Sequence, residues 1–385
     1  MRSLATALLV PVMLLLPVSG SAQSTVNIDV LLPLTGAAAY SGVTQQAAAR
    51  VYENVVNKTG GIHGVPLHFV FHDDQNDPKV AVEIVNELLP QHPVAILGPA
   101  VAATCAAIAP LFVNGPVNYC FSPALAPAKG GNVFASAITL HDVEFQMYAR
   151  LKKMGYKRFA VIATTDASGQ LSLQYAHEWS GLASNKDVQV VDIEAFSPAD
   201  ISIAAQVAKV KAANPDIICL YAIGTAFGTA LRELSNAGLS DITLYTTPAN
   251  ASVTQLDTYH AFLPKTLITS GMPYQGKLTN PAMKTAATEY LNSIKDAGLK
   301  FDTMQAYAWD PIKITVSALR ALPPGATAAQ LHTYLEGLHD FAGLWGMYDF
   351  RNGDQHGIDG RDSIYVYYDT TRNAWLPYDG PNAKG

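Results

Sequence analysis

The sequence predicts an α/β fold with two doubly wound lobes, each a mostly parallel sheet that carries helices on both faces. Three observations predict this fold. Strand-like and helix-like segments alternate along the chain, which is typical of βαβ units. The pattern of residues 26–119 is repeated over residues 142–246. No Gly/Ser-rich or Pro-rich linker separates the two blocks, so we expect the chain to cross between the lobes more than once.

The first block opens with an apolar run that ends at Pro33. Its first helix is indicated by Ala48, Val51 and Val55, which recur at helical spacing. Pro78 suits the first turn of the next helix, where no backbone N–H is needed. The expected strands are residues 26–32, 67–72, 94–97 and 117–119, and the expected helices are residues 44–57, 78–89 and 104–113.

The second block repeats the alternation. One of its helices must stop before Pro215, and another is closed by Gly238. The expected helices are residues 142–154, 171–183, 203–213 and 226–237, and the expected strands are residues 159–163, 188–193, 217–221 and 243–246. From about residue 280 we expect helices at residues 281–297, 303–322 and 327–338, followed by strands at residues 345–350 and 363–368.

Composition excludes several classes of function. A net charge of −6 argues against a nucleic-acid-binding surface, which usually shows a basic excess. No G-x-S-x-G elbow, H-E-x-x-H motif or zinc-type cysteine spacing is present. Residues 271–277 imitate the start of a phosphate-binding loop, but Leu278 stands where a Ser or Thr would hold Mg²⁺. We therefore expect no catalytic residues, no metal and no cofactor.

Residues 1–22 are typical of a secretory signal peptide. Arg2 supplies the positive start, an apolar stretch follows, and Gly20, Ser21 and Ala22 form a small-residue cleavage site. The alternative is a membrane anchor, although the apolar stretch is short for a span of roughly 20 residues. No cysteine follows the cleavage site to accept a lipid. We expect a soluble, unlipidated protein in the periplasm, beginning near Gln23.

An oxidising compartment favours a disulfide between Cys105 and Cys120, which lie 15 residues apart. They are expected at the start of a helix and the end of the next strand. Cys219 lies in an apolar run and is expected to be a buried thiol. The alternative is three free, unreactive thiols.

Several motifs, in order, resemble the type I periplasmic binding proteins, above all the leucine/isoleucine/valine-binding proteins of ABC importers. They are Leu32-Pro33-Leu34-Thr35-Gly36, Tyr40-Ser41-Gly42, Val56-Asn57-Lys58-Thr59-Gly60-Gly61-Ile62-His63-Gly64, His72-Asp73-Asp74-Gln75-Asn76-Asp77-Pro78, Ile96-Leu97-Gly98-Pro99, Asp166-Ala167-Ser168-Gly169 and Ala306-Tyr307-Ala308-Trp309-Asp310. Each motif is weak alone, but their order and spacing are specific.

The resemblance implies two lobes joined by three crossover strands, with a ligand bound in the cleft between them. Here the crossovers are expected near residues 137–141, 270–274 and 343–348. The first ligand-binding lobe would then comprise residues 23–139 and 273–344. The second would comprise residues 140–272 and 345–385.

The resemblance also implies site residues in the first lobe. Tyr40 matches an aromatic residue that packs on the ligand. Residues 100–104 match a loop whose backbone amides hold the ligand carboxylate, which points to the N–H groups near Ala103 and Thr104. The family's carboxylate-binding serine corresponds to Ala102 here.

Further positions depart from the family pattern. A threonine of the family becomes Leu125, beside Ser122, and two tyrosines of the second lobe become Ser168 and Thr225. Met304, with Tyr40 and Leu125, would supply an apolar wall, the alternative being ordinary core packing.

The acid that pairs with the α-ammonium group in amino-acid binders corresponds to Ala249 or Asn250. A buried ammonium without a carboxylate is costly. We therefore expect a periplasmic subunit of an ABC importer that binds a small carboxylate: an aromatic or aliphatic organic acid, or a branched-chain or neutral amino acid. It would be a monomer that delivers its ligand to an inner-membrane permease. The alternatives are a ligand sensor of the same fold acting on a signalling receptor, and a secreted enzyme.

Overall fold

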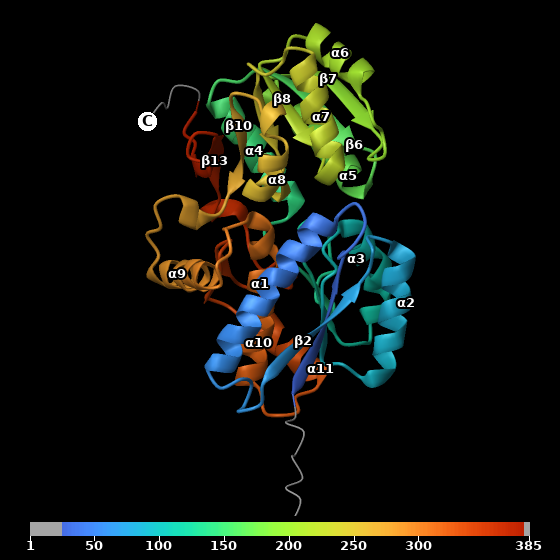
Figure 1. Ribbon diagram of the computed structural model, residues 1–385, viewed down its shortest axis with the longest axis vertical. Helices are drawn as coiled ribbons and strands as arrows, with labels where there is room; N and C mark the ends of the chain where they lie inside the picture. Colours follow the sequence, from blue (N-terminus) through green and yellow to red (C-terminus); the bar gives the residue numbers. More distant parts are fainter. Residues whose placement is uncertain (1–24, 381–385) are drawn as a thin grey trace, which may run out of the picture.

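The computed structural model describes residues 25–380 and consists of two α/β lobes stacked along the long axis of the molecule (Figure 1). The expected signal peptide, residues 1–22, lies outside the described residues. Within residues 25–380, no helix combines the length and the apolar character needed to span a membrane.

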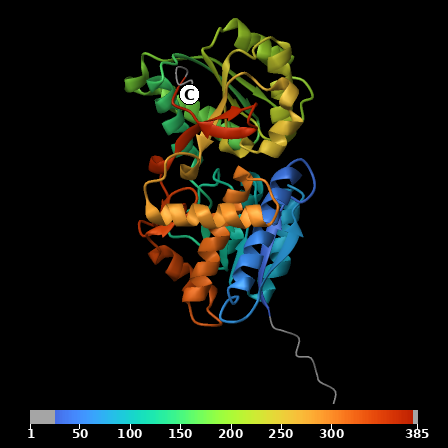
Figure 2. The ribbon, with the colours of Figure 1, turned by 60° about the vertical axis from the view of Figure 1, so that its left-hand side comes forward.

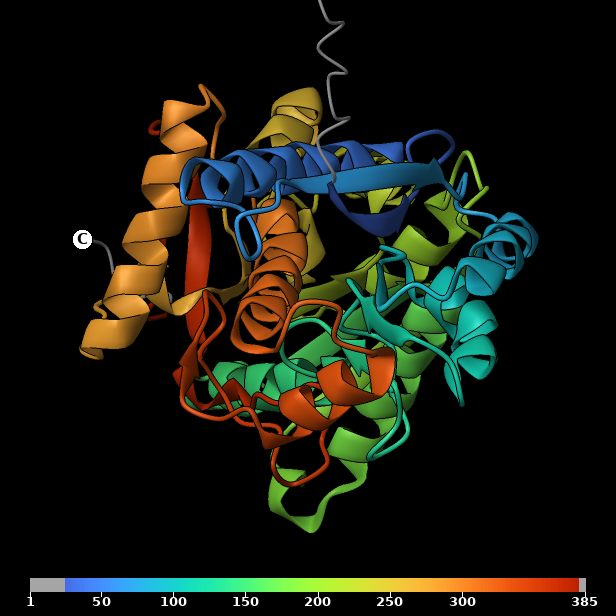
Figure 3. The ribbon, with the colours of Figure 1, turned by 90° about the horizontal axis from the view of Figure 1, so that it is seen from below.

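The first lobe combines the start of the chain with a later helical segment. Its strands are β1 (Val26–Leu32), β2 (Leu67–Asp73), β3 (Ala95–Leu97), β4 (Val117–Cys120), β5 (Val133–Ala135), β11 (Phe341–Ala342) and β12 (Met347–Tyr348). Its helices are α1 (Ala39–Lys58), α2 (Pro78–Leu88), α3 (Ala102–Ile108), α9 (Pro281–Asp296), α10 (Thr303–Ala321) and α11 (Ala328–Gly337). Seen from below, α1 and α10 lie side by side (Figure 3). Between them, Tyr52 packs edge-on against Trp309, with 5.0 Å between the ring centroids.

The second lobe holds the middle of the chain and its end. Its strands are β6 (Arg158–Thr164), β7 (Gln189–Phe196), β8 (Ile217–Tyr221), β9 (Thr243–Thr246), β10 (Leu267–Gly271), β13 (Ile364–Asp369) and β14 (Ala374–Pro377). Its helices are α4 (Leu140–Lys153), α5 (Ala167–Gly181), α6 (Ala204–Ala212), α7 (Gly224–Asn236) and α8 (Val253–Thr258). Across the two lobes, the short 3₁₀ turns are η1 (Leu89–Gln91), η2 (Ala109–Phe112), η3 (Ala183–Asn185), η4 (Pro248–Asn250), η5 (His260–Phe262), η6 (Pro273–Gln275) and η7 (Gly360–Asp362).

The two main sheets share one topology. The first has the order β2-β1-β3-β4-β5, and the second contains the equivalent order β7-β6-β8-β9-β10, all with parallel pairing. In the second sheet β13 and β14 extend this order by antiparallel pairing. In doubly wound folds of this order, ligands bind outside the carboxyl ends of the strands, where the strand order reverses.

Both sheets are buried on both faces, as a doubly wound fold requires. In β1, Val30 belongs to the core under α1 and α10, whereas the adjacent Leu31 belongs to the core under α2 and α3. In β8, Leu220 packs toward α6 and α7, whereas Cys219 packs toward α4 and α5. Each of these side chains is completely buried. The near-continuous apolar runs of the strands follow from this two-sided burial.

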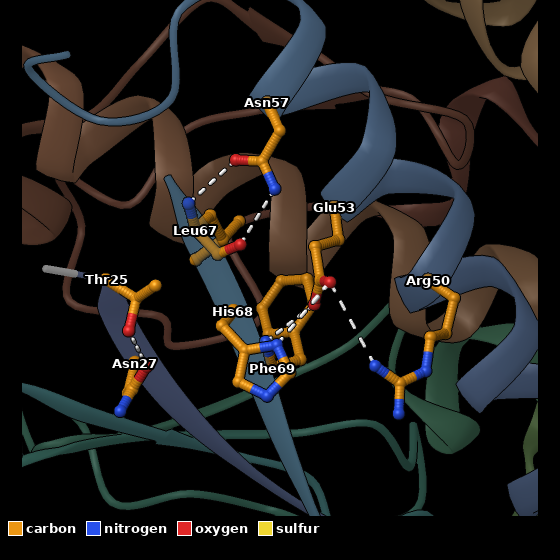
Figure 4. Close-up of polar contacts among 8 residues, drawn as sticks. All are labelled: Thr25, Asn27, Arg50, Glu53, Asn57, Leu67, His68 and Phe69. Carbon is orange, nitrogen blue, oxygen red and sulfur yellow. Dashed lines mark hydrogen bonds and ion pairs between the residues drawn. The ribbon is translucent and has the colours of Figure 1, made fainter. Parts of the chain in front are cut away.

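Side chains of α1 form hydrogen bonds with backbone groups on the outer side of β2, which is an edge strand (Figure 4). Asn57 accepts from the backbone N of Leu67 at 2.7 Å and donates to its carbonyl O at 2.8 Å. Glu53 accepts from the backbone N of Phe69 at 2.6 Å and pairs with His68. The helix therefore covers an edge that would otherwise offer unpaired backbone groups to another strand.

The chain passes between the lobes three times. The first passage lies between β5 and α4, and the second lies between β10 and α9, which crosses the face of the lower lobe in Figure 2. The third lies later than the expected residues 343–348: Phe350 and Ile358 still belong to the first-lobe core, and the chain enters the second sheet only at β13. Residues 345–358 thus pack with the first lobe, although the resemblance implied the second.

The sequence pattern missed several elements. Strands β5, β10, β11 and β14 and helix α8 were not expected, and the strand expected at residues 345–350 is reduced to the two residues of β12. Most of these segments are short, and they become strands because a neighbouring strand supplies hydrogen-bond partners. Their own sequences carry too few residues to show a period.

Candidate functional site

A cavity lies between the lobes, where the carboxyl ends of the strands of both sheets face one another. Its enclosed volume is about 90 Å³, and the space including the part open to solvent is about 750 Å³. Its first-lobe wall includes Tyr40, Ser41, Ala100, Val101, Ala102, Phe121, Ser122, Pro123, Ala124, Met304 and Tyr307. Its second-lobe wall includes Leu140, Thr164, Ser168, Gly169, Ser172, Tyr221, Ala222, Ile223, Thr247 and Ala249.

Several helices begin at this cavity. Ala102 opens α3, Ser168 and Gly169 lie in the first turn of α5, and Ile223 is the N-cap of α7. The N-terminus of a helix carries partial positive charge because its first N–H groups have no partner within the helix. None of the lining residues is a Lys, Arg or His. A small anion in the cavity would therefore be held by backbone N–H groups at these helix starts rather than by a cationic side chain.

Five of the residues expected from the resemblance do line the cavity. They are Tyr40, Ala102, Ser122, Ser168 and Met304. They come from α1, α3, the loop after β4, α5 and α10, so both lobes contribute. Ala249, one of the two positions weighed for the missing acid, lines the cavity as well.

The other five residues lie outside the cavity wall. The hydroxyl of Thr104 is buried and donates to the carbonyl O of Val101 at 2.8 Å. Ala103 is half-buried on another side of the same helix, and Thr225 is exposed. These side chains are turned away because neighbouring residues of one helix turn point in different directions.

Leu125 and Asn250 are committed to the interior of their own lobes. Leu125 packs into the core under α2 and α3. The side-chain nitrogen of Asn250 donates to the carbonyl O of Ala222 and to the hydroxyl of Thr246, both at 2.7 Å. This amide thereby links the ends of β8 and β9.

The expected disulfide is confirmed. Cys105 and Cys120 are bonded, with 6.0 Å between their Cα atoms. The bond joins α3, whose first residue lines the cavity, to β4, whose following loop also lines it. Cys219 is a buried free thiol, and burial raises its pKa.

Residues missed by the sequence analysis form much of the wall. Phe121 and Tyr221 lie at the carboxyl ends of β4 and β8, so the rule that ligands bind at this end of the strands could have found them. Tyr307 lies within α10 and packs against Trp345 with 4.8 Å between the ring centroids. Ser172 lies one turn beyond Ser168 on α5.

A buried carboxyl group stands directly behind this wall. Glu144 of α4 is 1% exposed, and its Oε1 accepts a hydrogen bond from the hydroxyl of Ser172. Burial raises the pKa of Glu144 to about 8, opposed by its hydrogen bond with Ser172. No periodicity in the sequence could distinguish this acid from a surface residue of an amphipathic helix.

The two lobes touch beside the cavity. The hydroxyl of Ser252, which precedes α8, donates to the carboxylate of Asp302, which precedes α10. Both residues are buried. In addition, α3 contacts α5 across the cleft. The cleft is thus closed along part of its rim. Within residues 25–380, no group of three His, Cys, Asp or Glu residues is arranged to hold a metal ion.

Comparisons with known proteins agree with this architecture. A leucine-, isoleucine-, valine-, threonine- and alanine-binding protein of Pseudomonas aeruginosa is 24% identical over 221 residues, which cover 57% of this chain and 59% of that protein. A Leu/Ile/Val-binding protein homologue of Brucella melitensis is 25% identical over 231 residues, covering 59% of this chain and 62% of that protein. The chain thus matches about 60% of the length of these curated relatives.

Solved structures show the same fold. An extracellular ligand-binding receptor from Rhodopseudomonas palustris superposes with a TM-score of 0.79 at 20% identity, covering 92% of this chain and all of that one. The branched-chain amino acid transporter substrate-binding protein LivJ from Streptococcus pneumoniae, in complex with isoleucine, gives a TM-score of 0.75 at 17% identity, covering 91% and 98% of the two chains.

The model of the periplasmic binding protein family matches residues 25–367. This match takes in the first sheet, strands β6 to β10 of the second sheet, and every residue that lines the cavity. The chain belongs to the periplasmic binding protein family.

Proposed function

We propose that this protein is the substrate-binding subunit of an ABC importer and binds a small carboxylate between its lobes. The ligand is an organic acid with an aromatic or aliphatic body, or a branched-chain or neutral amino acid. The observation that carries the proposal is the cavity itself, an apolar space on which the N-termini of helices from both lobes converge. The amino-acid binding named for the relatives supports the same ligand class.

The two parts of such a ligand have different places. Tyr40, Phe121, Met304 and Tyr307 offer apolar and aromatic surface to the ligand body. The carboxylate is held by backbone N–H groups at the helix starts, because no cationic side chain lines the cavity. Ser122 adds a hydroxyl close to this end.

The ligand is taken up and released unchanged. Closure of the lobes around it excludes water, and reopening delivers it to a permease of the inner membrane. The signal-peptide character of residues 1–22 supports export to the periplasm. The protein acts as a monomer, without a cofactor, and not as an enzyme.

A matched pair of variants on one helix turn tests the cavity. Ala102→Leu places a larger side chain in the cavity, whereas Ala103→Leu places the same side chain outside it. A thermal-shift screen with neutral amino acids and amine-free carboxylates first identifies a ligand, which should stabilise the protein by about 2.7 kcal/mol at 100-fold excess over Kd. We expect Ala102→Leu to abolish this shift and Ala103→Leu to retain it. Equal shifts in both variants would place the ligand elsewhere.

A further inference from the structure

Ser172 and Tyr221 line the cavity, and the hydrogen of each hydroxyl is donated to another protein group. The hydroxyl of Ser172 is 2.5 Å from Oε1 of Glu144 and 3.2 Å from the carbonyl O of Ser168, and it can donate only to one of them. The hydroxyl of Tyr221 donates to that of Tyr148 at 3.1 Å. A hydroxyl group has one hydrogen and two lone pairs. This part of the wall therefore offers the cavity hydrogen-bond acceptors.

Glu144 differs from the other acids next to the wall. Asp166 caps α5 by accepting from the backbone N of Gly169 at 2.9 Å, and Asp302 caps α10 by accepting from the backbone N of Met304 at 2.8 Å. Glu144 caps no helix. Its Oε2 is buried and has no hydrogen-bond partner among the described residues.

An ionised Glu144 with one unpartnered oxygen is unfavourable, because a buried carboxylate needs a positive partner or hydrogen-bond donors. The titratable groups that face it, from its own helix, α5, β8 and β9, are Tyr148, Tyr175, Cys219, Tyr221 and Tyr245. All of them have raised pKa values and are neutral at pH 7. None supplies a positive charge, so the partner that would ionise Glu144 has to come from the ligand.

We propose that Glu144 is a proton-linked positioning residue: it holds the Ser172 hydroxyl as an acceptor and ionises when a ligand places a cationic nitrogen against that hydroxyl. This inference rests on the proposed function and narrows its ligand class to carboxylates that also carry an ammonium group. It assigns the required negative charge to helix α4, a position that the resemblance did not indicate.

The proposal fixes a sign for the pH dependence. Burial raises the pKa of Glu144 to about 8, so the carboxyl is mostly protonated in the free protein at pH 7. A bound cation lowers this pKa, and binding then releases a proton. The affinity for an ammonium-bearing ligand should rise with pH, by up to tenfold per pH unit, and level off above about pH 8.

Two ligand pairs differ only in the amine and provide the test. They are leucine with 4-methylpentanoate, and phenylalanine with 3-phenylpropanoate. Isothermal titration calorimetry of the wild type from pH 6 to 8, and at pH 7 in two buffers with different ionisation enthalpies, counts the protons exchanged. We expect an amino acid to bind with release of most of one proton, and no release with its amine-free counterpart. This readout needs no variant.

Variants then assign the proton. Glu144→Gln should bind the amino acid at least tenfold more weakly at pH 8, with the pH slope and the proton release lost. Its affinity for the amine-free counterpart should be unchanged or higher. Asp74→Asn is the matched control, because Asp74 is also buried, also has an unpartnered oxygen, and lies outside the cavity wall. It should leave the pH slope unchanged.

Three outcomes are informative. Tighter binding of the amine-free ligands by the wild type, without proton exchange, would overturn the role of Glu144 and leave the proposed function intact. So would a Glu144→Gln variant that keeps the affinity and slope of the wild type. Binding of neither member of either pair to the folded wild type would instead overturn the proposed function, and the inference with it.

Discussion

Replacing Asp310 by alanine should strongly destabilise the first lobe. Asp310 lies within α10, is completely buried, and its Oδ2 accepts from three donors. They are the backbone N–H groups of Leu344 and Trp345, at 2.7 and 3.3 Å, and the hydroxyl of Tyr348, at 3.0 Å. Burial raises the pKa of Asp310 to about 6, so it is mostly ionised at pH 7.5.

The magnitude follows from the donors that lose their acceptor. Each buried donor left without a partner costs about 1–3 kcal/mol. Three of them, partly relieved by water, give a loss of roughly 3–6 kcal/mol for Asp310→Ala. Tyr348→Phe removes only one donor and leaves the acceptor paired, so it should cost about 1 kcal/mol.

Urea unfolding at pH 7.5, followed by circular dichroism, measures both variants against the wild type. The decisive quantity is the difference between the two changes in unfolding free energy. If Asp310→Ala costs no more than Tyr348→Phe, the shared acceptor contributes little, and the reasoning about buried donors is wrong for this site.

Three further predictions concern the disulfide, the buried acid and the contact between the lobes. Replacing both Cys105 and Cys120 by serine should lower the free energy of unfolding by about 3 kcal/mol, as expected for a loop of this length, and a reductant should then have no effect on the variant. The raised pKa of Glu144 makes its contribution to stability largest below about pH 4.5 and lowers it as pH rises toward 8; Glu144→Gln should therefore gain stability relative to the wild type by about 1.4 kcal/mol per pH unit in that range, and a constant difference would refute this. Ser252→Ala removes the hydrogen bond to Asp302, disfavours closure of the lobes, and should weaken ligand affinity about fivefold. The control is the thermal stability of the ligand-free protein, which this variant should change little.

Much of the fold could be predicted because its strands are buried on both faces. Residues 26–32, 217–221 and 243–246 were predicted with the bounds that β1, β8 and β9 have in the structure. Such runs are apolar, short and bounded by turn residues, so their pattern depends on the local sequence. The disulfide followed from the compartment and the spacing of two cysteines.

The cavity wall was only half predictable, because tertiary packing decides which way a side chain points. Ala102 and Ala103 are identical neighbours on one helix, and only the packing of α3 turns the first toward the ligand space. The resemblance predicts Asn250 as a site residue, but its side-chain amide donates to groups at the ends of β8 and β9, inside the lobe.

The sequence by itself determined the alternation of strands and helices and the membership of a binding-protein family, whereas the signal peptide at residues 1–22 stays a prediction. Only the tertiary structure decided where the chain makes its third passage and which residues face the cavity. It also decided that Glu144 lies beside the cavity. An acid on a helix gains a raised pKa only when other elements remove its water, here the strands and helix packed against α4. That desolvation is a property of the assembled lobe.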